Sequence, residues 1–330
     1  MAKIKDTDYL FLSTRVKCLE CSLLSHERME RMLEARTVED AAKVLQECGY
    51  AEMARVGQEE LDHAIAEQRH KTMEDLSSVA PDPRLIDVFK IKYDYHNVKV
   101  LLKADAMGVN ADRLLVDAGR VPAAALAEGM HNAELRGVSY TLRKAVSDAR
   151  DMLSTTGDPQ LADFILDRAY FAEMFELARA TGSSFLEGYV RISIDAANLR
   201  SLVRVLRMGK GPEFLRSVLF EGGNIHTSRV LAASGGSLEE LYAASALKDA
   251  AAAGAAALNG GGLTRFEKLC DDGVNAYLAG AKYVAFGEAP AIGYLAAKEN
   301  EFTAVRIILT GRMAGLDADT IRERLREAYV

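Results

Sequence analysis

Three stretches of the chain share one pattern: YDYHNVKVLLKA at 93–104, IDAANLRSLVRV at 194–205 and NEFTAVRIILTG at 300–311. When they are aligned, each has an acid at the second position and a base five residues later, and the first two have Asn three residues after the acid. The acids are 101 and 106 residues apart. Three matches at nearly constant spacing predict an internal triplication, with three helical repeats stacked around one axis.

The residues that recur in these stretches form a repeat signature. Its members are the acids, amides and bases Asp94, Asn97, Lys99, Asp195, Asn198, Arg200, Glu301 and Arg306. The third copy departs from the pattern, because Ala304 replaces the amide. The segments that follow the first two stretches also match and place Gly119 opposite Gly223. We therefore expect helical repeats at 1–110, 111–215 and 216–330, joined in one compact three-lobed body.

Composition and helix-capping signals favour an all-α fold. The chain has 330 residues with only 6 Pro and no Trp, and hydrophobic residues make up 49% of it. Proline at the start of a helix and glycine after its end are typical boundaries. They predict one long helix from Asp82-Pro83 to just before Gly108 and another from Asp158-Pro159 to Gly182. Further long helices are expected at 184–208 and from near 290 to just before 315.

Charge and hydropathy limit the partners and the location that we expect. The chain carries 41 Lys and Arg against 48 Asp and Glu, a net charge of −7, which opposes binding to nucleic acid. The longest charge-free stretch, 250–264, is rich in Ala and Gly and shorter than the roughly 20 apolar residues that span a bilayer. No signal peptide is recognised, and four cysteines suit a reducing compartment. We expect a cytoplasmic protein without direct membrane insertion.

The repeated residues allow two interpretations. An acid and an amide three residues apart share one helix face, whereas a base five residues away lies about 140° around the helix. A carboxylate on an apolar face needs donors from elsewhere, because an unpaired buried charge is costly. The acids therefore fix the repeats by accepting hydrogen bonds from adjoining segments, or their polar face lines a surface for a partner. Catalysis is disfavoured, since acids separated by whole repeats do not converge.

No pattern in the sequence predicts a catalytic, cofactor-binding or metal-binding residue. Cys18-Leu19-Glu20-Cys21 lies in a helical run with no second pair to complete a zinc site, so we expect buried or half-buried helical thiols. Cys48 and Cys270 are isolated and are expected to be buried in the same way. His96 is not repeated in the other copies. No cofactor is expected.

The triplicated helices, the segment IGYLAAKENEFTAVRIILTGRMAGL from 292 and the closing IRERLREAYV resemble the C subunit of the A/V-type ATP synthases, the counterpart of the d subunit of the eukaryotic V-ATPase. The likeness covers essentially the whole chain. It implies three pseudo-symmetric helical repeats arranged as a funnel around a central opening. It also implies a non-catalytic rotor subunit on the cytoplasmic face of the membrane. In that role the chain would couple central-stalk subunits to the proteolipid rotor ring during proton or sodium transport.

The resemblance suggests basic side chains as a possible central-stalk interface: Lys99, Lys103, Arg200, Arg204 and Arg306. The rival interpretation is that these are solvated charges or ion pairs within the chain, each contributing about 0–1 kcal/mol at exposed sites. Two other classes of function stay open at this point. One is a cytoplasmic helical-repeat adaptor that binds a protein outside any rotary motor. The other is an enzyme that uses Cys18 and Cys21, which would need an activated thiolate.

Overall fold

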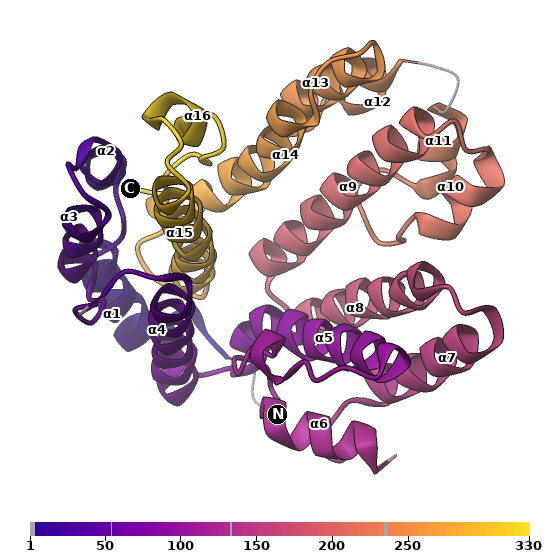
Figure 1. Cartoon of the computed structure of the whole chain (residues 1–330), viewed down its shortest axis with the longest axis horizontal. Helices are drawn as coiled ribbons and strands as arrows, with labels where there is room; N and C mark the ends of the chain where they lie inside the picture. Colours follow the sequence, from indigo (N-terminus) through magenta and orange to yellow (C-terminus); the bar gives the residue numbers. More distant parts are fainter. Residues whose placement is uncertain (1–3, 54, 133, 234–236) are drawn as a thin grey trace. The chain divides into compact units, whose positions relative to one another are not determined.

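The computed structural model describes residues 4–53, 55–132, 134–233 and 237–330 (Figure 1). Within these ranges all regular secondary structure is helical, which confirms the predicted all-α class. The chain divides into two compact units. Unit 1 consists of Met1–Pro81 and Ala232–Val330, and unit 2 consists of Asp82–Leu231. The three ranges expected from the repeats, and their funnel arrangement, stay a prediction.

Unit 2 is built around three long helices. Its elements in chain order are α5 (Arg84–Met107), the 3₁₀ helix η3 (Asp112–Leu114), α6 (Ala123–His131), α7 (Tyr140–Thr156), α8 (Pro159–Thr181), α9 (Ser184–Arg207), α10 (Pro212–Val218) and most of α11 (Thr227–Ala232). α8 packs against α5, α7 and α9. Leucine, valine and alanine side chains of α5 to α8 form a hydrophobic core cluster, with Leu142, Leu166 and Val98 completely buried.

Local signals set the boundaries of these helices. The Asp158 side chain accepts a hydrogen bond from the Gln160 N–H at 2.9 Å, Pro159 is the first residue of α8, and Gly182 follows its end with a φ of 74°. A left-handed residue at this position favours glycine. α5 differs slightly from the expectation, because it begins one residue after Pro83; the Asp82 side chain still accepts a hydrogen bond from its first N–H.

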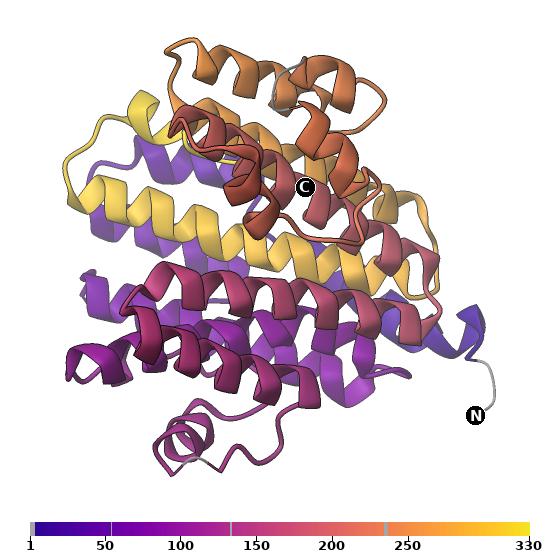
Figure 2. The same cartoon turned by 90° about the vertical axis from the view of Figure 1, so that its right-hand side faces the viewer.

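Unit 1 combines the two ends of the chain. Its N-terminal elements are η1 (Asp6–Tyr9), α1 (Leu10–Glu20), α2 (His26–Glu34), α3 (Val38–Lys43), η2 (Val44–Cys48) and α4 (Gln58–Val79). Its C-terminal elements are α12 (Leu238–Tyr242), α13 (Lys248–Leu258), α14 (Leu263–Leu278), η5 (Ala279–Tyr283), α15 (Ala289–Met313) and α16 (Ala318–Arg322). α15 packs against α1, α2, α3 and α4, and in Figure 2 it runs in yellow across these indigo helices. One core therefore contains residues from both ends of the sequence.

Candidate functional site

The acids of the first two signature copies hold the chain segment that precedes the next short helix. Asp94 in α5 is completely buried, and its Oδ1 accepts a hydrogen bond from the Val121 N–H at 3.2 Å. Asp195 in α9 is 1% exposed, and its Oδ1 accepts one from the Ile225 N–H at 3.0 Å. Val121 lies two residues before α6, and Ile225 lies two residues before α11. The two copies thus fasten equivalent segments.

The amides of the signature bind both backbone groups of one residue in the same segments. Asn97 donates to the Val116 carbonyl at 2.9 Å and accepts from the Val116 N–H at 2.8 Å. Asn198 makes the same pair of bonds with Phe220, both at 2.8 Å. Each amide takes the place of a backbone partner for a residue that lies outside any helix. It thereby satisfies both the N–H and the carbonyl of that residue.

Gly119 and Gly223 lie against the two acids. A Cβ atom at Gly119 would lie 2.1 Å from Asp94 Oδ1, and one at Gly223 would lie 2.2 Å from Asp195 Oδ1. No side chain fits at such a distance. The two glycines, which the sequence places opposite each other, thus allow the backbone to approach the carboxylates closely.

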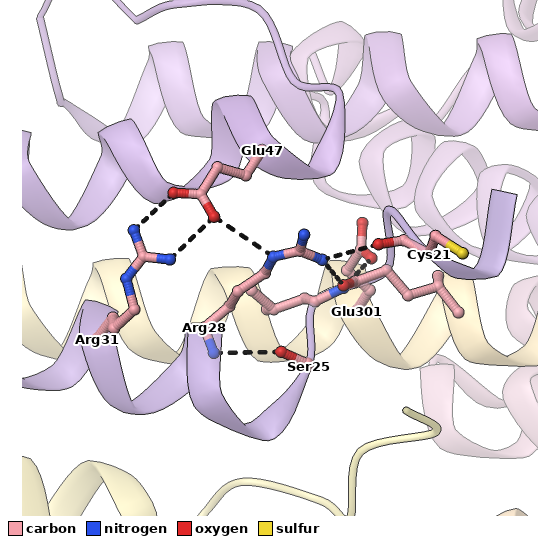
Figure 3. Close-up of polar contacts among 8 residues, drawn as sticks. Cys21, Ser25, Arg28, Arg31, Glu47 and Glu301 are labelled. Carbon is pink, nitrogen blue, oxygen red and sulfur yellow. Dashed lines mark hydrogen bonds and ion pairs between the residues drawn. The ribbon is translucent and has the colours of Figure 1, made fainter.

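The third copy binds a segment from the other end of the chain. Glu301 in α15 accepts hydrogen bonds from the Leu24 N–H at 2.9 Å, the Tyr50 hydroxyl at 2.9 Å and the Lys298 ammonium at 2.5 Å. Leu24 lies two residues before α2, which is the offset of Val121 and Ile225 from their helices. The segment that completes the third copy therefore comes from the beginning of the sequence. Figure 3 shows Glu301 beside the loop between Cys21 and Ser25.

The structure around the third copy explains why Ala304 stands where the other two copies have Asn. The residues that the amides bind, Val116 and Phe220, lie five residues before those that the acids bind. The equivalent residue in the third copy is Leu19, which belongs to α1 and whose carbonyl already accepts the Ser22 N–H at 3.0 Å. A side-chain amide has no unpaired extended residue to bind there, and a small apolar residue is sufficient.

Three of the basic residues predicted to contact the stalk form ion pairs with neighbouring helices. Lys99 forms an ion pair with Asp167, and Lys103 forms one with Asp163 at 2.6 Å; both acids belong to α8. Arg306 of α15 forms an ion pair with an acid of α4. The three basic side chains remain 24%, 42% and 47% exposed.

The other two bases of the predicted stalk interface belong to α9. There, Arg200 is half-buried and Arg204 is exposed. Of the five basic residues proposed to contact the stalk, at least three thus form ion pairs inside their own unit.

A polar network around Asp94 was not found by sequence reasoning. Arg120 lies 3.3 Å from Asp94 Oδ2 and donates to Glu173 at 2.5 Å, and Glu173 accepts the Tyr95 hydroxyl at 2.8 Å. Burial raises the pKa of Asp94, and the hydrogen bond from the Val121 N–H opposes this shift. The second signature copy has no arginine at the position equivalent to Arg120. Only the acid and the amide recur, so the repeated pattern did not predict this network.

A second network holds the loop that Glu301 binds. The Arg28 guanidinium donates to the carbonyls of Cys21 and Leu23 at 3.2 and 2.6 Å, and it lies 3.5 Å from Glu47 (Figure 3). Arg31 donates to both oxygens of Glu47, at 2.9 and 2.5 Å, and lowers the pKa of that carboxyl. These contacts join α2, η2 and the loop, so that the Leu24 N–H is held in place beside α15.

The thiols are distributed differently from the expectation. Cys48 and Cys270 are buried, as expected, but Cys18 and Cys21 are exposed at the end of α1. The sequence indicated that these cysteines belong to a helical run, but it did not reveal which face of α1 other elements cover. Among the described residues, no group of three or more His, Cys, Asp and Glu side chains is placed to hold a metal ion. In the same part of the chain, no helix is both long and apolar enough to cross a membrane.

These observations define an all-α protein in which three long helices, α5, α9 and α15, each hold a loop segment through one buried acid. Comparison with known proteins gives the family: the chain belongs to the ATP synthase (C/AC39) subunit family, whose model matches residues 12–324. The resemblance found in the repeated helices is thus confirmed.

Relatives match over nearly the full length of the chain. The C subunit of the V-type sodium ATPase of Enterococcus hirae is 23% identical over 98% of this chain and 99% of its own. The C subunit of the A-type ATP synthase of Haloferax volcanii is 24% identical over 96% of both chains. The C subunit of the V-type ATP synthase of Deinococcus radiodurans is 22% identical over 97% of this chain and 91% of its own.

Proposed function

We propose that this chain is a non-catalytic rotor subunit of an A/V-type ATP synthase or ATPase. It couples the central stalk to the proteolipid ring, on the cytoplasmic face of the membrane, during proton or sodium transport. The observation that carries the proposal is the family match over residues 12–324, together with relatives named as the C subunit that align over almost their whole length.

The packing of α15 supports a mechanical role. A part that transmits torque must resist bending, and close-packed helices transmit strain because their interiors have low compressibility. α15 is bound along its length by segments of unit 1: Glu301 holds the Leu24 N–H, Arg306 pairs with Asp62, and Arg312 donates to the carbonyls of Leu33 and Ala35. These bonds join a helix near one end of the sequence to helices near the other.

The proposed architecture is a funnel of three pseudo-symmetric repeats around a central opening. The equivalent acids and amides of α5 and α9, and the equivalent acid of α15, support three copies. The proposed contact with the stalk consists of five basic residues of α5, α9 and α15: Lys99, Lys103, Arg200, Arg204 and Arg306. The exposed fractions of Lys99, Lys103 and Arg306 leave room for an acidic partner surface to share or replace their internal carboxylates.

Binding to purified central-stalk subunits of the same organism tests this proposal. We expect saturable one-to-one binding by calorimetry, weakened at higher salt because screening reduces attraction between exposed charges. The double variant Arg200→Glu/Arg204→Glu should weaken binding while its helical content stays unchanged. The matched control Arg143→Glu/Arg216→Glu changes the same charge at exposed positions of α7 and α10 and should bind like the parent.

The outcomes separate the candidate functions. A folded chain that binds no stalk subunit would contradict the rotor proposal and would favour an adaptor for another protein. Binding that is equally strong in both double variants would remove Arg200 and Arg204 from the interface and retain the rotor role.

A further inference from the structure

The two exposed thiols of the chain lie at a tightened helix end. The Cys21 N–H donates to the Cys18 carbonyl at 3.3 Å, and the next two residues, Ser22 and Leu23, bond in the same way to the carbonyls three positions earlier. Successive bonds of this kind have 3₁₀ geometry, in which side chains three residues apart lie directly above each other. Cys18 and Cys21 therefore point to the same side of the turn.

The spacing of this turn matches the requirements of a disulfide. Cα atoms three residues apart are separated by about 5 Å in an α-helix and about 6 Å in a 3₁₀ helix. Disulfides join Cα atoms that are about 4.4–6.8 Å apart. Cys21 follows Glu20, the last residue of α1, so its Cβ can approach Cys18 by an adjustment of the turn that leaves α1 intact. In Figure 3 the Cys21 carbonyl faces Arg28, and the sulfur lies on the other side of the residue.

The groove beside Cys21 is open to small disulfides, and its cationic and acidic side chains balance in number. Cys21 lines an open groove of about 580 Å³, whose cationic side chains are Lys17, Arg28 and Arg31. The acids on the same groove are Glu20, Glu27 and Glu47, of which Glu47 is paired with Arg31 and Glu20 with Lys17. Arg28 also lies beside Glu47, but it donates its closest bond to the Leu23 carbonyl.

We propose that Cys18 and Cys21 form a reversible dithiol–disulfide site that exchanges with low-molecular-weight disulfides, for which glutathione disulfide serves as the probe. The Cys21 thiolate attacks one sulfur of the small disulfide, forms a mixed disulfide and releases one small thiol. The Cys18 thiolate then attacks the Cys21 sulfur and releases the second small thiol. The protein pair loses two electrons and two protons, and the small disulfide gains them.

The site is connected to the joint between α1 and α15. Cys21 begins the loop whose Leu24 N–H binds Glu301, and Arg28 holds the carbonyls of Cys21 and Leu23. The redox state of the pair therefore acts on the segment that completes the third signature copy. Cys48 is a contrast, because burial raises the pKa of its thiol to about 12 and keeps it protonated and unreactive.

The test is equilibration of the reduced, folded chain in buffers with graded ratios of glutathione to glutathione disulfide, followed by acid quenching and intact and peptide mass spectrometry. We expect one two-electron transition, with loss of two hydrogen atoms from a peptide that contains both Cys18 and Cys21. Cys18→Ser and Cys21→Ser should instead carry one glutathione each at the remaining thiol. Cys48→Ser is the matched control and should behave like the parent.

Two results would overturn the proposal. One is a parent chain that carries glutathione separately on Cys18 and Cys21 without a cross-link, which would show that the sulfurs do not meet. The other is a pair that stays fully reduced in pure glutathione disulfide. Circular dichroism of the oxidised chain accompanies the test, because a cross-link that appears only after loss of helix would also contradict a site in the folded protein.

Discussion

At the scale of single residues, Asn198 satisfies both backbone groups of Phe220, which is 9% exposed. Asn198→Ala leaves a buried N–H and a buried carbonyl unpaired, each at about 1–3 kcal/mol, so we expect a loss of about 3 kcal/mol in the free energy of unfolding. The exposed Asn259 is the control, and Asn259→Ala should change it by less than about 0.5 kcal/mol. Urea denaturation measures both; equal effects would show that the amide does not support the loop.

The backbone at residue 223 lies so close to the Asp195 carboxylate that only glycine fits there. A Cβ would lie 2.2 Å from the carboxylate, so Gly223→Ala must displace the acid or the loop, and we expect a loss of about 1–3 kcal/mol. Gly211 has no atom within 4 Å of an added Cβ, and Gly211→Ala should lower the stability by less than about 1 kcal/mol. Denaturation midpoints distinguish the two. A harmless Gly223→Ala would refute the tight contact.

Asp195 makes the stability depend on pH. Burial raises its pKa above the ordinary value of about 3.9, so the folded state keeps a proton that the unfolded state has already lost. This contribution is fully present below the unfolded pKa and is lost as the pH rises through the folded pKa.

The variant Asp195→Asn isolates this contribution. The stability of the parent minus that of Asp195→Asn should therefore fall as the pH rises above about 4. A difference that rises over this range, measured by urea denaturation at each pH, would contradict the raised pKa.

At the scale of elements, a buried ion pair within α15 lies at the contact of this helix with the N-terminal segment. Lys298 and Glu301 are 3% and 4% exposed, and Glu301 also binds the Leu24 N–H. Glu301→Gln leaves the Lys298 charge unpaired, and we expect a loss of about 3–5 kcal/mol. Lys298→Met/Glu301→Gln removes that charge and should recover at least about 1 kcal/mol. Losses that simply add would show that the two groups act independently.

Elements whose ends are set by local signals could be predicted from the sequence. Contacts between distant residues could not. Asp158, Pro159 and Gly182 set the ends of α8 through bonds and angles within a few residues, so the sequence alone was sufficient. The partner of Glu301 is 277 residues away in the chain, and no periodicity relates the two positions. The exposure of Cys18 was missed for a similar reason, because spacing along α1 does not reveal which elements cover it.

At the scale of the whole molecule, the triplication stays a prediction, which rests on three copies of a short pattern at nearly constant spacing. The sequence did not reveal which segment the third acid holds, because Glu301 in α15 binds a loop from the start of the chain. The partners of the basic residues in α5, α9 and α15 could not be predicted either. Their charge suggested a surface for a partner, and three of them meet carboxylates of α8 or α4 that lie far away in sequence.

In the proposed function, this chain couples the stalk to the ring. This coupling is tested most directly by measuring ATP hydrolysis and ATP-driven ion transport together, in vesicles that contain the A/V-type complex assembled with or without this chain. We predict that the complex without the chain hydrolyses ATP without transporting ions, and that adding the purified chain restores transport. Transport that stays coupled to hydrolysis in the complete absence of the chain would contradict the proposed coupling role.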